Sequence, residues 1–313
     1  MSVQLKQNNN TVKLNSGASI HQIGLGTWKS TNGSEGYDSV IAALKAGYRH
    51  IDTAAIYRNE DQVGKAIRDS GVPREEIFVT TKLWGTQQQQ PEKALEQSLQ
   101  RLGLDYVDLY LMHWPVPLNP GSLTDEEIIT IPTLPNGKRD VLSKPTWDFV
   151  KTWELMQKLP KEKARAIGVS NFSINNLKEL MASPGFKITP AVNQVELHPR
   201  LPQDELVQWC LKHDIQMEAY SPLGSTDAPI LSEQLILDIA KKLNVSPAQV
   251  VISWHCQRGY IVLPKSVTPT RIEANLKTFT LPKDDFNAIL NLSKDKGELR
   301  VCNPDWSPFV PFV

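Results

Sequence analysis

The sequence predicts an α/β protein whose fold class is a (β/α)8 barrel, the TIM-barrel architecture. Short apolar runs alternate with amphipathic helical stretches along most of the chain. There are eight such runs, the number that closes a parallel barrel, and polar residues follow them at regular spacing. We expect one domain over residues 1–313, because α/β barrels of this length commonly remain undivided.

The first predicted element is an N-terminal β-hairpin at residues 11–23, where apolar and polar residues alternate around the turn Asn15-Ser16-Gly17. The predicted barrel strands are Ile23–Leu25, Arg49–Ile51, Ile77–Leu83, Tyr106–Met112, Ala164–Val169, Ala191–Val195, Ile215–Ala219 and Tyr260–Leu263. The predicted helices between them include Tyr37–Ala46, Pro91–Leu102, Ile174–Leu180, Gln203–His213 and Leu231–Leu243.

Three segments depart from this alternation. Residues 116–146 follow the fourth strand, are rich in proline, glycine and charge, and are too long for an ordinary connection, so they predict a functional loop over the barrel mouth. Residues 281–293 predict an extra helix after the eighth unit. The tail, CNPDWSPFVPFV, carries three prolines and three aromatic residues and predicts an extended segment docked on the surface.

Composition excludes several classes of partner. Lysine plus arginine and aspartate plus glutamate both total 34, so no net charge attracts nucleic acid or an anionic membrane, and we expect a small-molecule partner. Cys210, Cys256 and Cys302 lie far apart and are odd in number, which argues against a disulfide framework. The polar N-terminus and the lack of an 18-residue apolar run favour a cytoplasmic protein, and the neutral composition favours a monomer.

The strongest functional signal is the position of polar residues at the strand ends. Asp52 follows the second strand, Lys82 ends the third and His113 follows the fourth, at intervals of 30 and 31 residues, about one βαβ unit each. Tyr57 comes shortly after Asp52. Each residue alone is best explained as a helix cap, a surface lysine or a core side chain. Because they recur in phase with the barrel, we expect them to meet at its catalytic rim.

These residue types suit the reduction of a carbonyl group. A free tyrosine has a pKa of about 10, and a lysine ammonium beside it favours the phenolate and lowers that pKa. Tyr57 is therefore the predicted proton donor, with Lys82 lowering its pKa and Asp52 holding Lys82 in place. A neutral His113 could donate a hydrogen bond to the substrate carbonyl. No HExxH or CxxC spacing accompanies these residues, so we predict no metal.

The attacking group must then come from a cofactor. No GxGxxG motif opens a βα unit, so a Rossmann-type site is disfavoured. After the eighth strand, Lys265 and Ser266 precede Thr268-Pro269, a credible start of a helix, and Arg271 lies in its first turn, which together suit a phosphate monoester. Further along the rim, a flat ring could stack on Tyr220, and a carboxamide could bind to three side chains, Ser170, Asn171 and Gln194.

Tryptophans supply a predicted substrate pocket. Trp28, Trp84 and Trp114 each follow a strand end, and Trp306 lies in the tail. A single tryptophan is usually a core residue, but three at rim positions favour an apolar wall for a carbonyl substrate.

The chain resembles the aldo-keto reductases over nearly its whole length in seven motifs: GYRHIDTAAIYRNEDQVG, TTKLWG, LYLMHWP, AIGVSNF, VNQVELHP, AYSPLGS and LPKSVTPTRIEANLKTF. Within that family it is most similar to fungal members of the glycerol dehydrogenase and carbonyl reductase type. The resemblance implies an oxidoreductase that reduces aldehydes and ketones with NADPH, and in reverse oxidises alcohols such as glycerol or other polyols with NADP⁺.

The resemblance also implies roles for individual residues. The catalytic residues would be Tyr57, Asp52, Lys82 and His113. The cofactor would bind to Gly26, Thr27, Trp28, Asp52, Ser170, Asn171, Gln194, Tyr220, Ser221, Leu223, Ser225, Lys265, Ser266, Arg271 and Asn275. The substrate would contact Trp28, Tyr57, Trp84, His113, Trp114, Cys302, Asn303 and Trp306. Ala274 departs from the pattern, since many relatives have a glutamate there, and this leaves the contacts to the adenine open.

Two other readings of the same residues stay open at this point. The chain could be a redox-sensing subunit that binds the cofactor and reports its state to a partner, as potassium-channel β-subunits do. It could also be a barrel enzyme that acts on sugar phosphates with Lys82 as the nucleophile, although this does not explain Tyr57. Turnover of an aldehyde with NADPH separates the reductase from both.

Overall fold

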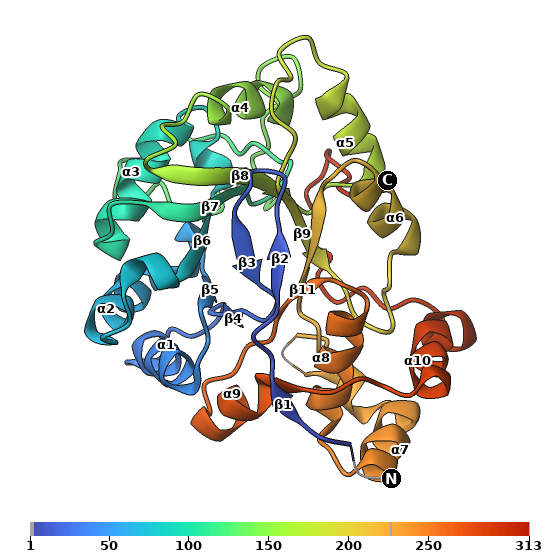
Figure 1. Cartoon of the computed structure of the whole chain (residues 1–313). Coiled ribbons are helices and arrows are strands. Elements are labelled where there is room, and N and C mark those ends of the chain that lie inside the picture. The colour runs from blue at the N-terminus through green and yellow to red at the C-terminus, as the bar shows by residue number, and fades with distance from the viewer. Residues whose placement is uncertain (1–2, 226, 313) are drawn as a thin grey trace.

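Eight parallel strands form a barrel in the computed structural model, which describes residues 3–225 and 227–312 (Figure 1). The strands are β4 (Leu25–Gly26), β5 (His50–Asp52), β6 (Phe78–Leu83), β7 (Val107–Met112), β8 (Ala164–Ser170), β9 (Val192–Glu196), β10 (Gln216–Tyr220) and β11 (Ile261–Leu263). They follow one another around the sheet in chain order. A parallel bridge between Ile23 and Val262 and a hydrogen bond from the Gly24 N–H to the Val262 carbonyl (3.0 Å) connect the last strand to the first. The predicted barrel is therefore confirmed.

Helices surround the ring of strands (Figure 1). They are α1 (Glu35–Ala46), α2 (Glu60–Asp69), α3 (Pro91–Leu102), α4 (Phe149–Met156), α5 (Ile174–Met181), α6 (Asp204–Lys212), α7 (Gln234–Leu243), α8 (Pro247–Gln257), α9 (Pro269–Asn275) and α10 (Lys283–Lys296). Short 3₁₀ helices lie at η1 (Ala55–Tyr57), η2 (Arg74–Glu76), η3 (Gly85–Gln87) and η4 (Pro229–Ser232). None of the helices in the described ranges is long and apolar enough to cross a membrane.

The N-terminal hairpin closes the amino-terminal end of the barrel. Its strands, β2 (Thr11–Lys13) and β3 (Ser19–His21), pair antiparallel and lie across the middle of the ring in Figure 1. Leu14 and Ile20 pack against residues near the starts of the barrel strands, including Leu109 and Ile261. The Asn15 amide donates hydrogen bonds of 2.9–3.4 Å to three carbonyls on the barrel loops. The hairpin thus seals the barrel interior at the end away from the strand C-termini.

Most predicted boundaries agree with the structure to within two residues. The predicted helix at Leu231–Leu243 begins later, at Gln234, because Pro229–Ser232 forms the separate 3₁₀ turn η4. The extra helix is present as α10, which starts directly after Pro282. One feature was not predicted: β1 (Lys6–Gln7) pairs antiparallel with β12 (Lys277–Thr278), because strands of two residues leave no periodic signal.

The long loop and the tail meet above the strand C-termini. Residues 116–146 contain no helix and only isolated bridges, such as Leu118 with Val141. From the tail, Trp306 packs into one apolar cluster with Trp84 and Trp114, which follow β6 and β7. The two segments with the weakest sequence pattern therefore cover the barrel mouth together.

Gly64 in α2 provides a test of the helix packing. Alanine inside a helix is usually more favourable than glycine by about 1 kcal/mol. At Gly64 a Cβ atom would overlap the backbone of Leu102 at the end of α3, and a backbone cannot rotate away as a side chain can. We expect Gly64→Ala to lower the free energy of unfolding by about 3 kcal/mol, measured by urea denaturation. Lys65→Ala, at the exposed neighbouring position, should change it by about 0.5 kcal/mol or less. A stabilised Gly64→Ala variant would show that the two helices pack differently.

Candidate active site

A cavity of about 1390 Å³ lies at the carboxyl ends of the barrel strands. It is lined by the residues that the sequence analysis proposed for catalysis, cofactor and substrate, with the exception of Lys82, which lies behind the wall: Gly26, Thr27, Trp28, Asp52, Tyr57, Trp84, His113, Trp114, Ser170, Asn171, Gln194, Tyr220, Ser221, Leu223, Ser225, Lys265, Ser266, Arg271, Asn275, Cys302, Asn303 and Trp306. Positions spread over nearly 300 residues of sequence are thus brought to one cavity.

The centre of the site is an ion pair inside the barrel. The Lys82 ammonium on β6 lies 2.6 Å from the Asp52 carboxylate at the end of β5, and the lysine side chain is fully buried. The ammonium also donates to the Thr53 carbonyl (2.9 Å) and to the Tyr57 hydroxyl (3.4 Å). Tyr57 ends the 3₁₀ turn η1, which carries the chain from β5 to the cavity wall. The expected contact of the phenol with the lysine is present.

Burial opposes the predicted effect on Tyr57. Burial raises the pKa of the Tyr57 hydroxyl to about 12, although the Lys82 charge acts in the opposite direction. The expectation that the lysine brings this pKa below its ordinary value was therefore wrong for the protein without a ligand. Desolvation of the phenolate raises the pKa by more than the Lys82 charge lowers it. Burial also disfavours the Lys82 charge, but Asp52 and Tyr57 outweigh it, so the pKa of Lys82 lies above its usual value.

His113 is a neutral group at the same end of the cavity. Burial and the nearby Lys82 charge hold the pKa of His113 well below its ordinary value. The imidazole ring packs edge-on against Tyr57, with centroids 5.7 Å apart, and against Trp84, at 5.5 Å. Its Nδ1 has no hydrogen-bond partner in the described parts of the chain. The surroundings of His113 therefore disfavour its charged form, and the imidazole is neutral, as expected from the sequence.

Gln194 connects this centre to a second carboxyl group. Its amide nitrogen donates to Asp52 (2.8 Å) and to Glu218 (3.0 Å), which leaves the side-chain oxygen to accept a hydrogen bond from a ligand amide. Burial and the Asp52 charge raise the pKa of Glu218 to about 8. The other Glu218 oxygen lies 3.4 Å from His50, whose pKa burial lowers to about 3.

Glu218 was not predicted as a site residue, although the sequence contains a signal for it. Glu218 lies on the same strand, β10, two residues before Tyr220, so the two side chains share one face. A carboxylate at an inward position of an apolar strand marks a polar group inside the barrel.

The neighbouring wall is held by the hydrogen bonds of Asn171, one of which joins it to Tyr220. The Asn171 amide nitrogen donates to the His113 carbonyl (2.9 Å), and its oxygen accepts from the Tyr220 hydroxyl (2.8 Å). Asn171 has a backbone φ of 63°, a left-handed conformation that asparagine tolerates. The Ser170 hydroxyl donates to the Gln194 carbonyl (2.8 Å). These contacts fix the aromatic ring of Tyr220 at the cavity wall.

The far end of the cavity carries two cations. Lys265 and Arg271 are exposed, and among the described residues no carboxylate forms an ion pair with either. Thr268 precedes α9 as predicted, with Pro269 at the first helical position, although the Thr268 side chain makes no capping hydrogen bond. Two accessible positive charges next to Ser266 suit a phosphate group.

Aromatic rings form the wall nearest His113. The Trp306 ring centroid lies 6.3 Å from that of Trp84 and 5.4 Å from that of Trp114. The Trp84 indole N–H donates to the Thr130 carbonyl of the long loop (2.5 Å). Trp28, which is 43% exposed, lies at the open side. Cys302 also lines the cavity, and burial raises the pKa of its thiol.

Glu196 holds the tail in place, and the sequence analysis missed it as well. This residue ends β9, and its buried carboxylate accepts hydrogen bonds from the backbone N–H groups of Val301 and Cys302, both at 2.7 Å, and lies 2.9 Å from His198 Nε2. Burial alone would raise the pKa of Glu196, but these hydrogen bonds outweigh it and the pKa lies below its ordinary value. A strand-end glutamate in the motif VNQVELHP was the available signal.

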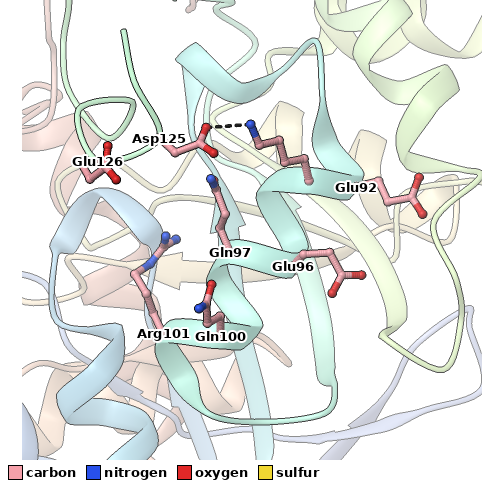
Figure 2. Close-up of a pocket in the computed structure, with 8 residues that line it drawn as sticks. Glu92, Glu96, Gln97, Gln100, Arg101, Asp125 and Glu126 are labelled. Atoms are coloured by element: carbon pink, nitrogen blue, oxygen red, sulfur yellow. Dashed lines mark hydrogen bonds and ion pairs between the residues drawn. The ribbon is translucent and has the colours of Figure 1, made fainter.

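A second cavity, of about 870 Å³, lies on the outer surface between α3 and the long loop (Figure 2). Its lining residues are Glu92, Lys93, Glu96, Gln97, Gln100, Arg101, Asp125 and Glu126. Lys93 pairs with Asp125 (2.7 Å) and Arg101 with Glu60 (2.7 Å). None of the predicted site residues lines this second cavity. Across the described ranges, no three His, Cys, Asp or Glu side chains are grouped so that they could hold a metal ion.

The Glu196 anchor predicts a change in tail dynamics. Hydrogen bonds to a charged group contribute about 1.5–3 kcal/mol each, so Glu196→Gln should speed hydrogen exchange at the amides of Val301 and Cys302 by about tenfold or more. Mass spectrometry of peptides from the tail would measure this. Glu205→Gln, at an exposed position of α6, should leave the exchange rates unchanged. Equal rates in wild type and Glu196→Gln would contradict the anchoring role.

Comparison with known proteins agrees with the geometry. Residues 22–294 match the model of the aldo/keto reductase family. The chain is 64% identical to glycerol 2-dehydrogenase (NADP(+)) of Saccharomyces cerevisiae. It is 62% identical to aldehyde reductase YPR1 of the same organism, and both matches cover the full length of both chains.

Solved structures give the same answer. The aldose reductase from Schistosoma japonicum superposes with a TM-score of 0.83 at 36% identity, covering 94% of each chain. An aldo/keto reductase from Brucella melitensis superposes with a TM-score of 0.74 at 44% identity, covering 90% of this chain and 99% of that one. The motifs, the barrel and these relatives together show that this chain belongs to the aldo-keto reductase family.

Proposed function

We propose that this protein is an NADPH-dependent oxidoreductase that reduces aldehydes and ketones to alcohols, with Tyr57 as the general acid. The observation that carries the proposal is the Tyr57 hydroxyl at the cavity wall, 3.4 Å from a lysine that is itself paired with Asp52. A phenol supported in this way can give a proton to a carbonyl oxygen as negative charge develops there.

Each catalytic side chain has a separate task in this mechanism. When bound, NADPH supplies the hydride that reduces the carbonyl carbon. His113, neutral at pH 7, orients the carbonyl by a hydrogen bond to its oxygen. Tyr57 transfers its hydroxyl proton to that oxygen, and the Lys82 ammonium stabilises the phenolate that remains. Asp52 keeps Lys82 charged and in position.

The pKa of Tyr57 favours the reductive direction in the protein without a ligand. With a pKa raised to about 12, the tyrosine is protonated at neutral pH and ready to donate. The reverse reaction needs the phenolate to accept a proton from the alcohol. Oxidation therefore gains from alkaline conditions, whereas reduction does not.

The cavity residues fit NADPH in an extended form. Gln194 presents its free side-chain oxygen, and Ser170 and Asn171 lie beside it, which suits the amide of the nicotinamide ring. Tyr220 provides a flat surface for the ring. At the other end, Lys265 and Arg271 suit the 2′-phosphate that distinguishes NADPH from NADH. Gly26, Thr27, Ser221, Leu223, Ser225, Ser266 and Asn275 line the path between and around these ends.

The relatives narrow the substrate class. One is named glycerol 2-dehydrogenase (NADP(+)) and another aldehyde reductase, so we infer that small aldehydes and ketones are reduced and that glycerol or a similar polyol is a substrate in the oxidative direction. No feature of the site and none of these relatives favours the redox-sensing alternative.

We further infer a single domain over residues 1–313 and a cytoplasmic monomer that acts on small molecules and not on nucleic acid. The balanced charge supports the absence of a nucleic-acid partner. Outside the cavity, the exposed large apolar side chains lie on separate elements, including Leu211 on α6 and Leu237 on α7, which supports the monomer. Three free cysteines support a reducing compartment.

Removal of one hydroxyl tests the general acid. Tyr57→Phe should lower kcat for aldehyde reduction by about 10²- to 10⁴-fold, because the proton donor is lost, while the Kd for NADPH stays within about twofold. Steady-state kinetics and fluorescence titration with NADPH would measure the two quantities. Tyr110→Phe removes a buried hydroxyl that has no partner among the described residues and should leave both unchanged. Parallel loss of turnover and NADPH binding in Tyr57→Phe would refute the assignment.

Cofactor selectivity tests the phosphate end. Arg271→Ala should raise the Kd for NADPH by about 10- to 100-fold and that for NADH by less than about threefold, since only NADPH carries the 2′-phosphate. Titration with both cofactors would show this. Lys277→Ala, which removes a charge outside the cavity, is the matched control. Equal weakening of NADPH and NADH would rule out a contact between Arg271 and the 2′-phosphate.

A further inference from the structure

Arg139 is a cavity residue that neither the motifs nor the mechanism accounts for. It lies in the long loop and lines the same cavity as Tyr57 and His113. Its guanidinium carbon lies 4.0 Å from the centroid of the Trp306 ring, so the cation rests on the face of a tryptophan from the tail. The loop and the tail therefore combine at this point of the substrate wall.

The N–H groups at this point have no acceptor. Within residues 3–225 and 227–312, Nη1 of Arg139 and Nε1 of Trp306 are buried and lack any hydrogen-bond partner. Trp306 is only 3% exposed, whereas the indole of Trp84, in the same wall, is paired with a carbonyl. Two lining residues from separate segments, each with one unpaired donor, are thus in contact at the cavity wall.

No carboxylate of the described residues forms an ion pair with the guanidinium. Asp305 is near enough to act on the Arg139 charge, but the two form no ion pair. The Asp305 carboxylate instead accepts hydrogen bonds from the backbone N–H and the hydroxyl of Ser307, at 2.9 and 2.5 Å. Apart from Cys302 and Asn303, the rest of this wall is aromatic and aliphatic, with Ile56 packed against the tryptophans. A charged donor in apolar surroundings is unfavourable unless a ligand supplies the acceptor.

We propose that Arg139, with the Trp306 N–H as a second donor, forms a carboxylate-binding subsite for carbonyl substrates. This rests on the proposed function and names the substrate class of that site: aldehydes and ketones that carry a carboxylate remote from the carbonyl. A guanidinium matches the two oxygens of a carboxylate better than any other side chain does.

The geometry sets the separation between carboxylate and carbonyl. Successive ring contacts lead from Arg139 to Trp306, from Trp306 to Trp84 (6.3 Å between centroids) and from Trp84 to His113 (5.5 Å). Along this wall, two tryptophan rings therefore lie between His113, where the carbonyl would bind, and the guanidinium of Arg139. A flat, rigid acid that spans an aromatic ring suits such a wall.

A matched pair of substrates tests the subsite. The kcat/KM for para-carboxybenzaldehyde and for its neutral methyl ester would be measured with saturating NADPH in wild type and three variants. We expect the ratio of acid to ester to fall by about 10- to 100-fold in Arg139→Gln, because a charge-assisted pair is lost. Trp306→Phe keeps the ring, removes the N–H and should lower the ratio by a few-fold. Lys138→Gln removes the neighbouring exposed charge and should leave the ratio unchanged.

The outcomes separate the subsite from the proposed function. A ratio that is unchanged in Arg139→Gln, or an equal fall for acid and ester, would overturn the subsite and leave Arg139 as a packing residue. If wild type reduces neither compound, the proposed function fails. The subsite can then be tested without turnover, by calorimetric titration of the NADP⁺ complex with para-(hydroxymethyl)benzoate and with its methyl ester. The ratio of the two Kd values would be compared between wild type and Arg139→Gln.

Discussion

The buried ion pair between Lys82 and Asp52 is the interaction on which the rest of the site depends. Two charges removed from water are stable only when each is paired and its remaining hydrogen-bonding capacity is satisfied. Thr53 and Tyr57 meet the needs of the ammonium, and Gln194 those of the carboxylate. The side chains that satisfy the pair are thus the ones that face the cavity. Their orientation is fixed by the requirements of the barrel interior before any ligand binds, which is the kind of preorganisation that catalysis needs.

The sequence was most informative where chemistry follows the barrel period. Asp52, Lys82 and His113 recur about one βαβ unit apart, so their convergence could be predicted and the structure shows it. Glu218 lies inside the predicted strand Ile215–Ala219 and was treated as part of an apolar strand. Glu196 directly follows the predicted strand Ala191–Val195 and was not recognised as a strand-end residue with a role of its own. Arg139 lies in a segment without periodicity, where no rule relates position to space. The direction of the shift in the Tyr57 pKa was predicted wrongly, because desolvation depends on how the chain packs, and no sequence motif encodes that packing.

Two kinds of chain segment line the cavity. The proposed cofactor half comes from strand ends, the turns that follow them and helix α9, from Ser170 and Gln194 to Arg271. The proposed substrate half combines residues that follow strand ends, such as Trp84 and His113, with the 116–146 loop and the tail, which contribute Arg139 and Trp306 and belong to no barrel strand or helix. In this proposal the part that would bind the constant reactant is attached to the rigid scaffold. The loop and the tail, which would select among variable reactants, can change without disturbing the barrel.

The way in which Glu196 binds the tail has a consequence for the evolution of the protein. Its carboxylate recognises two peptide N–H groups and no side chain of Val301 or Cys302. These two hydrogen bonds can form with any amino acid other than proline at those positions. Mutations can therefore accumulate along this stretch and alter the chemistry next to Tyr57 while the backbone stays in register with the barrel. An anchor that ignores side-chain identity allows a lineage to explore new substrates without first having to evolve a new way to hold the tail.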